Sequence, residues 1–371
     1  NLDWLATSLN LSPEMVRERA QRQAAQLEGT PLPPSHLRNA AKAAPEVDSK
    51  ASELDRERLH SVLTGTPVDE QSLDQLAMVT DSFMRQSWNV NPHSLLPAVT
   101  GHFSGFGNIL LGVPPALAAR AYSMAGEVAF LAGYLLRKSG LTTDANFYWQ
   151  ASERMAQSAG DTNLQSIIFT IQGWQAHDEG QLEKAKMVLD RAQLVLGVNP
   201  NPMTAALAYS SHSYTLAAVG QEHSAAKDIQ TAERYLNRVS GNDAWLYTME
   251  SIHDEVDIVR GWYLFRLQQY EDSAQNFEQI LARIDSTWKA QQANILAHLG
   301  AVHAQQGDID RATYTFSKGL RIAREAAAPL YAQRIARMRK QWLGNNDSPA
   351  VRRLDEEFTT KLVPEWSQRK R

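Results

Sequence analysis

The sequence predicts an all-α protein in which pairs of antiparallel helices stack into a right-handed superhelix. The first observation behind this prediction is a short segment of the form Gly-polar-x-x-x-small, which recurs five times. The five segments begin at Gly140, Gly180, Gly220, Gln268 and Gly307. Successive starts are 40, 40, 48 and 39 residues apart. A nearly constant period of this size is typical of a helical repeat array.

The second observation is that two flanking positions recur in register with these segments. Seven residues before each start lies a small residue, namely Gly133, Gly173, Ser213, Gly261 or Gly300. Nine residues after each start lies a bulky apolar residue, namely Trp149, Leu189, Ile229, Phe277 or Phe316. A small residue in the first helix lets the second helix approach closely, and the bulky residue fills the remaining gap. A glycine at the turn ends the first helix in the left-handed conformation.

Two of the repeated segments carry a resemblance to a known repeat type. Residues 180–192 (GQLEKAKMVLDRA) and 307–319 (GDIDRATYTFSKG) are similar to tetratricopeptide repeats, and the resemblance extends over about 115–328. It implies a solenoid with a concave groove, but not what the groove binds. Helical periodicity at Ser72–Met84 and Leu95–Leu111 indicates a degenerate first repeat or cap. Helices near Leu330–Trp342 and Ala350–Lys361 are expected to cap the other end.

The composition excludes several classes of protein. The 371 residues are 43% hydrophobic, carry a net charge of −4 and contain no cysteine. Such a chain is neither disordered nor a polycation, and it has no disulfide or thiolate chemistry. No apolar run approaches the roughly 20 residues of a membrane-spanning helix, so we expect a cytoplasmic protein. The C-terminal stretch is locally basic, and we interpret it as a solvated basic helix end and a frayed basic tail rather than as a phosphate-binding site. Its basic residues are Arg334, Arg337, Arg339, Lys340, Arg352, Arg353, Arg369, Lys370 and Arg371.

The chain is predicted to fall into three parts. Residues 1–28 form a helical stump, in which Ser12 caps a helix that begins at Pro13. Residues 29–55 contain four prolines and form a linker. Residues 56–371 form the repeat domain.

The stump carries a second resemblance. Its run Leu5-Ala6-x-x-Leu9-x-Leu11-Ser12-Pro13-Glu14 resembles the last helices of a phage-repressor-like (XRE-type) helix-turn-helix domain. With the linker and the repeats, the chain is similar to a family of bacterial one-component transcriptional regulators. That resemblance implies DNA binding through a domain upstream of Asn1, effector sensing by the repeats, and a homodimer. The recognition helix and its arginines are not present in this sequence.

The repeat register predicts which side chains face the concave groove. The position after each mid-helix small residue is aromatic in four of the five repeats, at Tyr134, Trp174, Tyr214 and Trp262. The positions three before, four after and one turn earlier add further candidates, namely Phe130, Thr170, Arg137, His177, Phe265, Glu255 and Asn294. An apolar wall with a few polar groups is typical of ligand pockets, and aromatic anchors dominate peptide recognition. His177 and Asp178 together are interpreted as a solvated helix end.

The sequence contains no specific enzyme motif, so we expect no catalytic residue, cofactor or metal site. Two functions remain open. The first is a sensor whose groove binds a peptide or small-molecule effector and reports to a DNA-binding domain. The second is an interaction scaffold without a DNA-binding role, whose groove binds a segment of a partner protein. A helix-turn-helix in the residues upstream of Asn1 would decide for the sensor.

Overall fold

The computed structural model describes residues 68–87, 90–239 and 252–366, and within these ranges it contains helices and no strand. Two helices, α5 (Glu70–Gln86) and α6 (Pro92–Gly112), come first. Five helix pairs follow: α7 (Pro115–Lys138) with α8 (Thr142–Ala159), α9 (Thr162–Asp178) with α10 (Leu182–Leu194), α11 (Pro202–Ala218) with α12 (Glu222–Leu236), α13 (Ile252–Arg266) with α14 (Tyr270–Arg283), and α15 (Lys289–Gln305) with α16 (Ile309–Glu325). The helices α17 (Pro329–Leu343) and α18 (Pro349–Trp366) end the fold.

This architecture confirms the predicted all-α superhelix and its end helices. The helices predicted at 72–84 and 95–111 are α5 and α6, and those at 330–342 and 350–361 lie within α17 and α18. The predicted stump at 1–28 and linker at 29–55 lie outside the described residues. No helix among the described residues combines the length and apolar character that crossing a bilayer requires.

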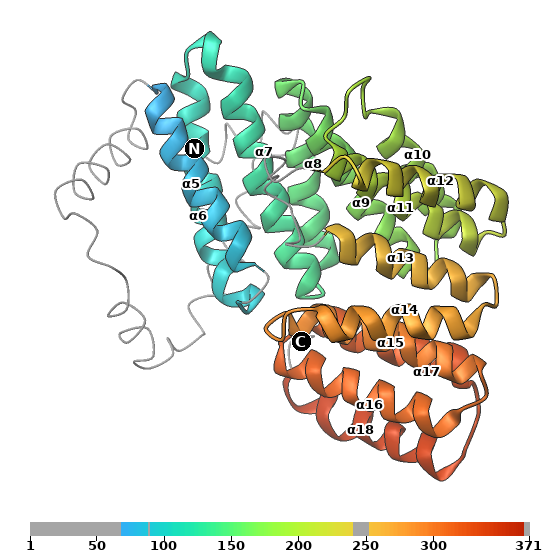
Figure 1. Ribbon diagram of the computed structural model, residues 1–371. Coiled ribbons are helices and arrows are strands. Elements are labelled where there is room, and N and C mark those ends of the chain that lie inside the picture. Colours follow the sequence, from blue (N-terminus) through green and yellow to red (C-terminus); the bar gives the residue numbers. More distant parts are fainter. Residues whose placement is uncertain (1–67, 88–89, 240–251, 367–371) are drawn as a thin grey trace.

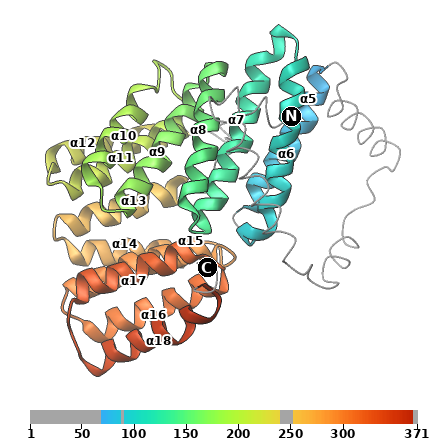
Figure 2. The same ribbon diagram turned by 180° about the vertical axis from the view of Figure 1, so that it is seen from behind.

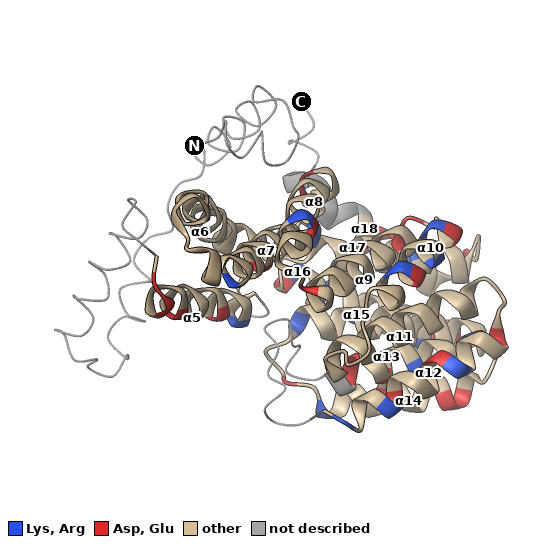
Figure 3. Ribbon diagram, turned by 90° about the horizontal axis from the view of Figure 1, so that it is seen from above, with Lys and Arg blue, Asp and Glu red and all other residues tan. Residues whose placement is uncertain are grey.

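The helices form two layers (Figure 1). The first helix of each pair packs against the first helix of the next, so that α7, α9, α11, α13, α15 and α17 make one continuous layer. We call these the inner helices, and their partners α8, α10, α12, α14 and α16 the outer helices. The last inner helix, α17, also contacts the first, α7 (Figure 2). Many charged residues lie on the outer helices α10, α12 and α14 (Figure 3).

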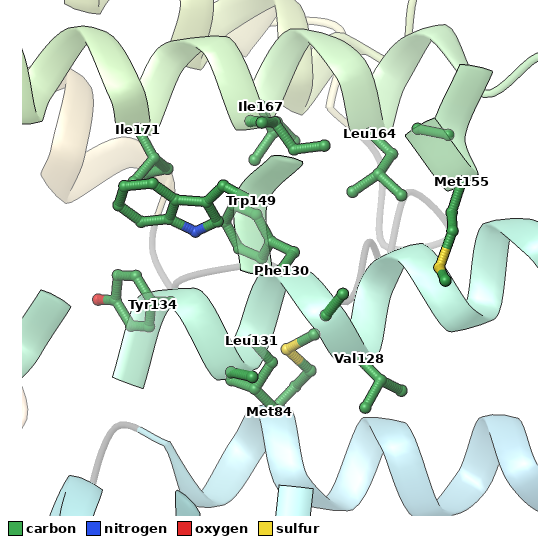
Figure 4. Packing of buried hydrophobic residues seen from close by; sticks show 14 of the residues in the cluster. Met84, Val128, Phe130, Leu131, Tyr134, Trp149, Met155, Leu164, Ile167 and Ile171 are labelled. Carbon is green, nitrogen blue, oxygen red and sulfur yellow. The ribbon is translucent and has the colours of Figure 1, made fainter. Parts of the chain in front are cut away.

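The two helices of each pair meet at the predicted contact between a small and a bulky residue, which we call the seam. A Cβ atom added to Gly133 would lie 2.5 Å from the Trp149 ring, and one added to Gly300 would lie 2.7 Å from Phe316. Trp149 itself is fully buried between α7 and α9 (Figure 4). In the third pair, Ser213 takes the place of glycine and donates a hydrogen bond of 2.8 Å to the Ala225 carbonyl. The seams therefore confirm the close approach that the repeat pattern predicts.

The turns within the pairs show why glycine recurs there. Gly140, Gly180, Gly220 and Gly307 have φ between 76° and 81°, in the left-handed region. The fourth turn places Gln268 in the same region, with φ 60°. A side chain in this conformation strains the backbone, so the fourth turn carries a cost that the other four avoid.

Candidate functional site

The inner helices line a partly open cavity of about 70 Å³. Every inner helix contributes to its wall, from Tyr134 of α7 to Tyr331 of α17. One ordered water needs roughly 10–15 Å³ measured in this way, so the cavity has room for a small group of atoms. Because α17 returns to α7, the cavity lies where the beginning and the end of the repeat array meet.

Most of the predicted groove residues line this cavity. They are Tyr134, Arg137, Trp174, His177, Tyr214, Glu255, Trp262 and Asn294. Three others lie outside its wall. Phe130 packs beneath Trp149 in the core (Figure 4). The Thr170 hydroxyl donates to the Ser166 carbonyl of its own helix at 2.9 Å, and Phe265 stacks behind Trp262 at 4.5 Å between ring centroids.

The aromatic side chains of the cavity wall hold one another in place. The indole nitrogen of Trp174 donates to the Ser211 hydroxyl at 2.8 Å. The rings of His177 and Tyr214 lie 4.1 Å apart, and that of Tyr214 meets Trp262 edge-on at 5.7 Å. These contacts join α9, α11 and α13. The wall is therefore a connected aromatic surface rather than a set of separate rings.

A cluster of charges closes the cavity between α7, α9 and α17. The Asp178 carboxylate accepts hydrogen bonds from Arg137 at 2.7 Å, from Arg334 at 2.7 and 2.8 Å, and from Arg337 at 3.1 Å. Arg337 also donates to the Asp178 backbone carbonyl, at the end of α9, where a cation is favoured. Burial alone would raise the pKa of Asp178, but Arg334, Arg137 and Arg337 together hold it well below its usual range.

This cluster corrects two interpretations of the sequence. Arg334 and Arg337 are not a solvated helix end, because both pair with a carboxylate located more than 150 positions earlier in the chain. His177 and Asp178 are not a solvated helix end either, since both line the cavity and the Asp178 side chain is only 14% exposed. Arg339 also has a partner, the Asp355 carboxylate of α18. All three arginines therefore serve tertiary structure.

Two hydrogen bonds join α15 to the neighbouring helices of the wall, α13 and α17. The Glu255 carboxylate accepts a hydrogen bond from Gln291, and the Asn294 amide oxygen accepts one from Arg334. Burial raises the pKa of Glu255 to about 7, although the Gln291 hydrogen bond opposes this change. Glu255 is thus near the midpoint of its titration at neutral pH.

The histidines of the wall are neutral. Burial lowers the pKa of His177 to about 4, with the Asp178 carboxylate acting in the opposite direction. Burial, aided by the Arg334 charge, also holds the pKa of His298 well below its usual value. At neutral pH both imidazoles can therefore donate one hydrogen bond and accept another.

Several wall residues were absent from the predicted set, namely Asp178, Ile258, Val259, Gln291, His298, Tyr331 and Arg334. Ile258 has a sequence signal, since it is the three-before residue of its repeat. Arg334 and Tyr331 have none, because their place depends on where the superhelix brings α17.

No known family model and no curated protein matches this chain. A crystal structure of the APC/C hetero-tetramer Cut9–Hcn1 is similar with a TM-score of 0.42 and 14% identity, over 76% of this chain and 54% of that one. This chain thus spans about half of that relative. A structure of phAimR with a ligand is similar with a TM-score of 0.31 and 13% identity, over 79% of this chain and 93% of that one. Likenesses of this size do not extend to function.

Proposed function

We infer that the chain is the sensing part of a transcriptional regulator, and that a peptide or small-molecule effector binds in the cavity. The observation that supports this most is the convergence of all six inner helices on one cavity. A molecule bound there contacts the first and the last inner helix at the same time. A mostly aromatic wall with a few polar groups is also the usual composition of a ligand site.

A ligand bound at this position acts on the contacts that determine the curvature of the superhelix. The Asp178 cluster holds α17 against α7 and α9 through ion pairs of 2.7–3.1 Å. An effector that pushes these helices apart or draws them together changes the curvature of the whole array. In a dimer that carries DNA-binding domains upstream of Asn1, this change alters the spacing of the two domains.

Native mass spectrometry of the purified chain tests whether the cavity holds an effector. We expect a co-purifying mass that is lost in Trp174→Ala, because Trp174 lines the cavity. Tyr314→Ala is the matched control, since Tyr314 is 70% exposed on the outer helix α16. A mass that survives Trp174→Ala would place the ligand elsewhere. Small-angle scattering unchanged by saturating ligand would contradict the change in curvature.

The second candidate function is an interaction scaffold, which one feature of the outer surface favours. Met187 and Leu194 lie two turns apart on α10 and are 59% and 84% exposed, and Val198 just beyond is 96% exposed. Exposed apolar side chains close together can mark a protein contact. A spectrum without any co-purifying mass, together with a partner protein that is lost in Leu194→Asp, would favour the scaffold over the sensor.

A further inference from the structure

Three guanidinium groups converge on one carboxylate at the edge of the cavity. Arg137 and Arg334 line the cavity, and Arg337 reaches the same Asp178 carboxylate from the α17 side. Two of these guanidinium groups bind the same carboxylate oxygen, because the Nη2 nitrogens of Arg137 and Arg334 each lie 2.7 Å from Asp178 Oδ2. Burial also raises the pKa of the other carboxyl of the wall, Glu255, to about 7. The Asp178 carboxylate thus faces three guanidinium groups.

The wall also contains nitrogen atoms that lack a hydrogen bond. His177 Nε2, Trp262 Nε1 and His298 Nδ1 are buried and have no partner among the described residues. Trp262 and His298 are 3% and 4% exposed, so solvent does not readily satisfy them. An indole nitrogen can only donate, so its partner must be an acceptor atom. A ligand that pairs with Trp262 Nε1 therefore carries a hydrogen-bond acceptor.

A cationic ligand does not fit the same wall. The Asp178 carboxylate is already surrounded by arginines, and Glu255 accepts from Gln291. One aromatic face of the wall already has a cation, because the Arg266 guanidinium lies 5.1 Å from the centroid of the Trp262 ring. A further positive charge would meet repulsion from several sides.

The size of the cavity limits which part of a ligand can enter. Its volume of about 70 Å³ is about half of the roughly 150 Å³ that accommodates benzene in an engineered core. A carboxylate with a short arm fits this space, whereas a whole peptide does not. The remainder of a longer ligand would have to extend away from the cavity.

We propose that the cavity binds the carboxylate of a small acid or of a peptide chain end, with Arg137 and Arg334 as its ion partners. The guanidinium group matches the planar geometry of a carboxylate, and the two arginines come from α7 and α17. A carboxylate held by both joins the first inner helix to the last. This assignment rests on the proposed function and specifies the chemical class of its effector.

The test uses the full chain and four sets of probes in affinity selection with mass-spectrometric readout, followed by calorimetry. The probes are tripeptides with a free C-terminus, the same tripeptides amidated, propionate with butyrate, and the two corresponding amides. We expect the acids to bind at least about tenfold more tightly than the amides. The set of acids that is retained identifies the source of the carboxylate. Equal binding of acids and amides would overturn the proposal.

Variants of Arg137 connect the binding to this site. Arg137→Gln is expected to weaken acid binding by about tenfold or more, and Arg137→Lys, which keeps the charge, by less. Arg260→Gln is the matched control, because Arg260 pairs with Glu233 and Asp257 and does not line the cavity. If Arg137→Gln fails to fold, Arg137→Lys decides. Unchanged affinity in the folded variants would overturn the proposal.

The outcomes separate this proposal from the proposed function on which it rests. Amides that bind as tightly as the acids and are lost in Trp174→Ala would overturn the carboxylate assignment while supporting an effector cavity. Failure of the wild-type chain to bind any probe would also overturn the carboxylate assignment. The effector cavity would then depend on the co-purifying mass alone.

Discussion

Gly133 and Arg137 lie one turn apart on α7, yet they belong to two regions built on different principles. At the seam, Gly133 meets the fully buried Trp149, with no room for even a Cβ atom. In the cavity wall, Arg137 meets a shared carboxylate, aromatic rings and open space. The seam is filled by a buried ring, whereas the wall keeps charges and a void. The difference indicates that the seams stabilise the array and that the wall preserves a site at a cost in stability.

The largest expected effect is the loss of the Asp178 charge from the wall. Asp178→Asn leaves three arginines around an uncharged amide, so we expect a loss of about 3–5 kcal/mol in the free energy of unfolding. Urea denaturation at pH 7 measures this loss, and hydrogen exchange shows whether α17 loses protection first. Asp81→Asn is the control, because its pair with Arg85 is largely exposed and contributes below about 1 kcal/mol. Equal effects of the two substitutions would contradict the closing role of Asp178.

The next effect has the opposite sign and depends on pH. The pKa of Glu255 rises from 4.5 to about 7 on folding, so the folded state holds this proton more tightly than the unfolded state does. The contribution of Glu255 to stability is therefore lost as the pH rises from about 4.5 to 7. Glu255→Gln removes that loss and is expected to stabilise the chain above pH 7 by about 3 kcal/mol.

Denaturation of wild type and Glu255→Gln across pH 4–8 checks this prediction. The difference between the two proteins should be smallest at pH 4, below the usual pKa of 4.5, where Glu255 is mostly protonated in both states. The titration of His177, whose pKa is lowered to about 4, affects both proteins alike and cancels in the difference. A difference that stays constant over the whole range would show that Glu255 does not titrate as its burial implies.

At the seam, a single added methyl group should destabilise the fold. Gly133→Ala places a Cβ atom 2.5 Å from the Trp149 ring, which must move, and we expect a cost of about 1–3 kcal/mol. Gly101→Ala on α6 is the matched control, since no atom lies within 4 Å of its added Cβ. Alanine is the better helix former, so the control should gain about 0.5–1 kcal/mol. If the melting temperatures of both variants moved in the same direction, this would contradict the close contact between Gly133 and Trp149.

The smallest effect concerns the strained turn of the fourth pair. Gln268→Gly relieves a side chain at φ 60° and is expected to stabilise the chain by about 1 kcal/mol. The reciprocal change, Gly307→Gln, should cost a similar amount because Gly307 has φ 81°. Thermal denaturation measures both changes. A neutral result for the pair would mean that the turns adapt their backbone to the residue.

The seams could be predicted from the sequence and the closing cluster could not, for a physical reason. The contact between Gly133 and Trp149 depends on positions 16 apart within one helix pair, so a local repeat pattern specifies it. The aromatic register likewise placed Tyr134, Trp174, Tyr214 and Trp262 on the wall. The pairing of Asp178 with Arg334 depends instead on the accumulated rotation of several repeats.

Equivalent positions of the repeats do not all line the cavity, although the repeat pattern treats them alike. Phe130 and Thr170 have the same register as Ile258, but only Ile258 reaches the cavity. Thr170 turns its hydroxyl back to its own helix, and Phe130 is covered by Trp149. Equivalent positions of different repeats therefore have different environments.

The return of α17 to α7 also restricts how this array can evolve. Most helical solenoids are open at both ends and change length by gaining or losing whole repeats, because each repeat contacts only its neighbours. Here one additional helix pair would carry Arg334 away from Asp178 and break the ion pair between them. Duplication and deletion, the ordinary route of change in repeat proteins, would break the ring of contacts. Change in this chain is therefore confined to point substitutions within a fixed number of repeats.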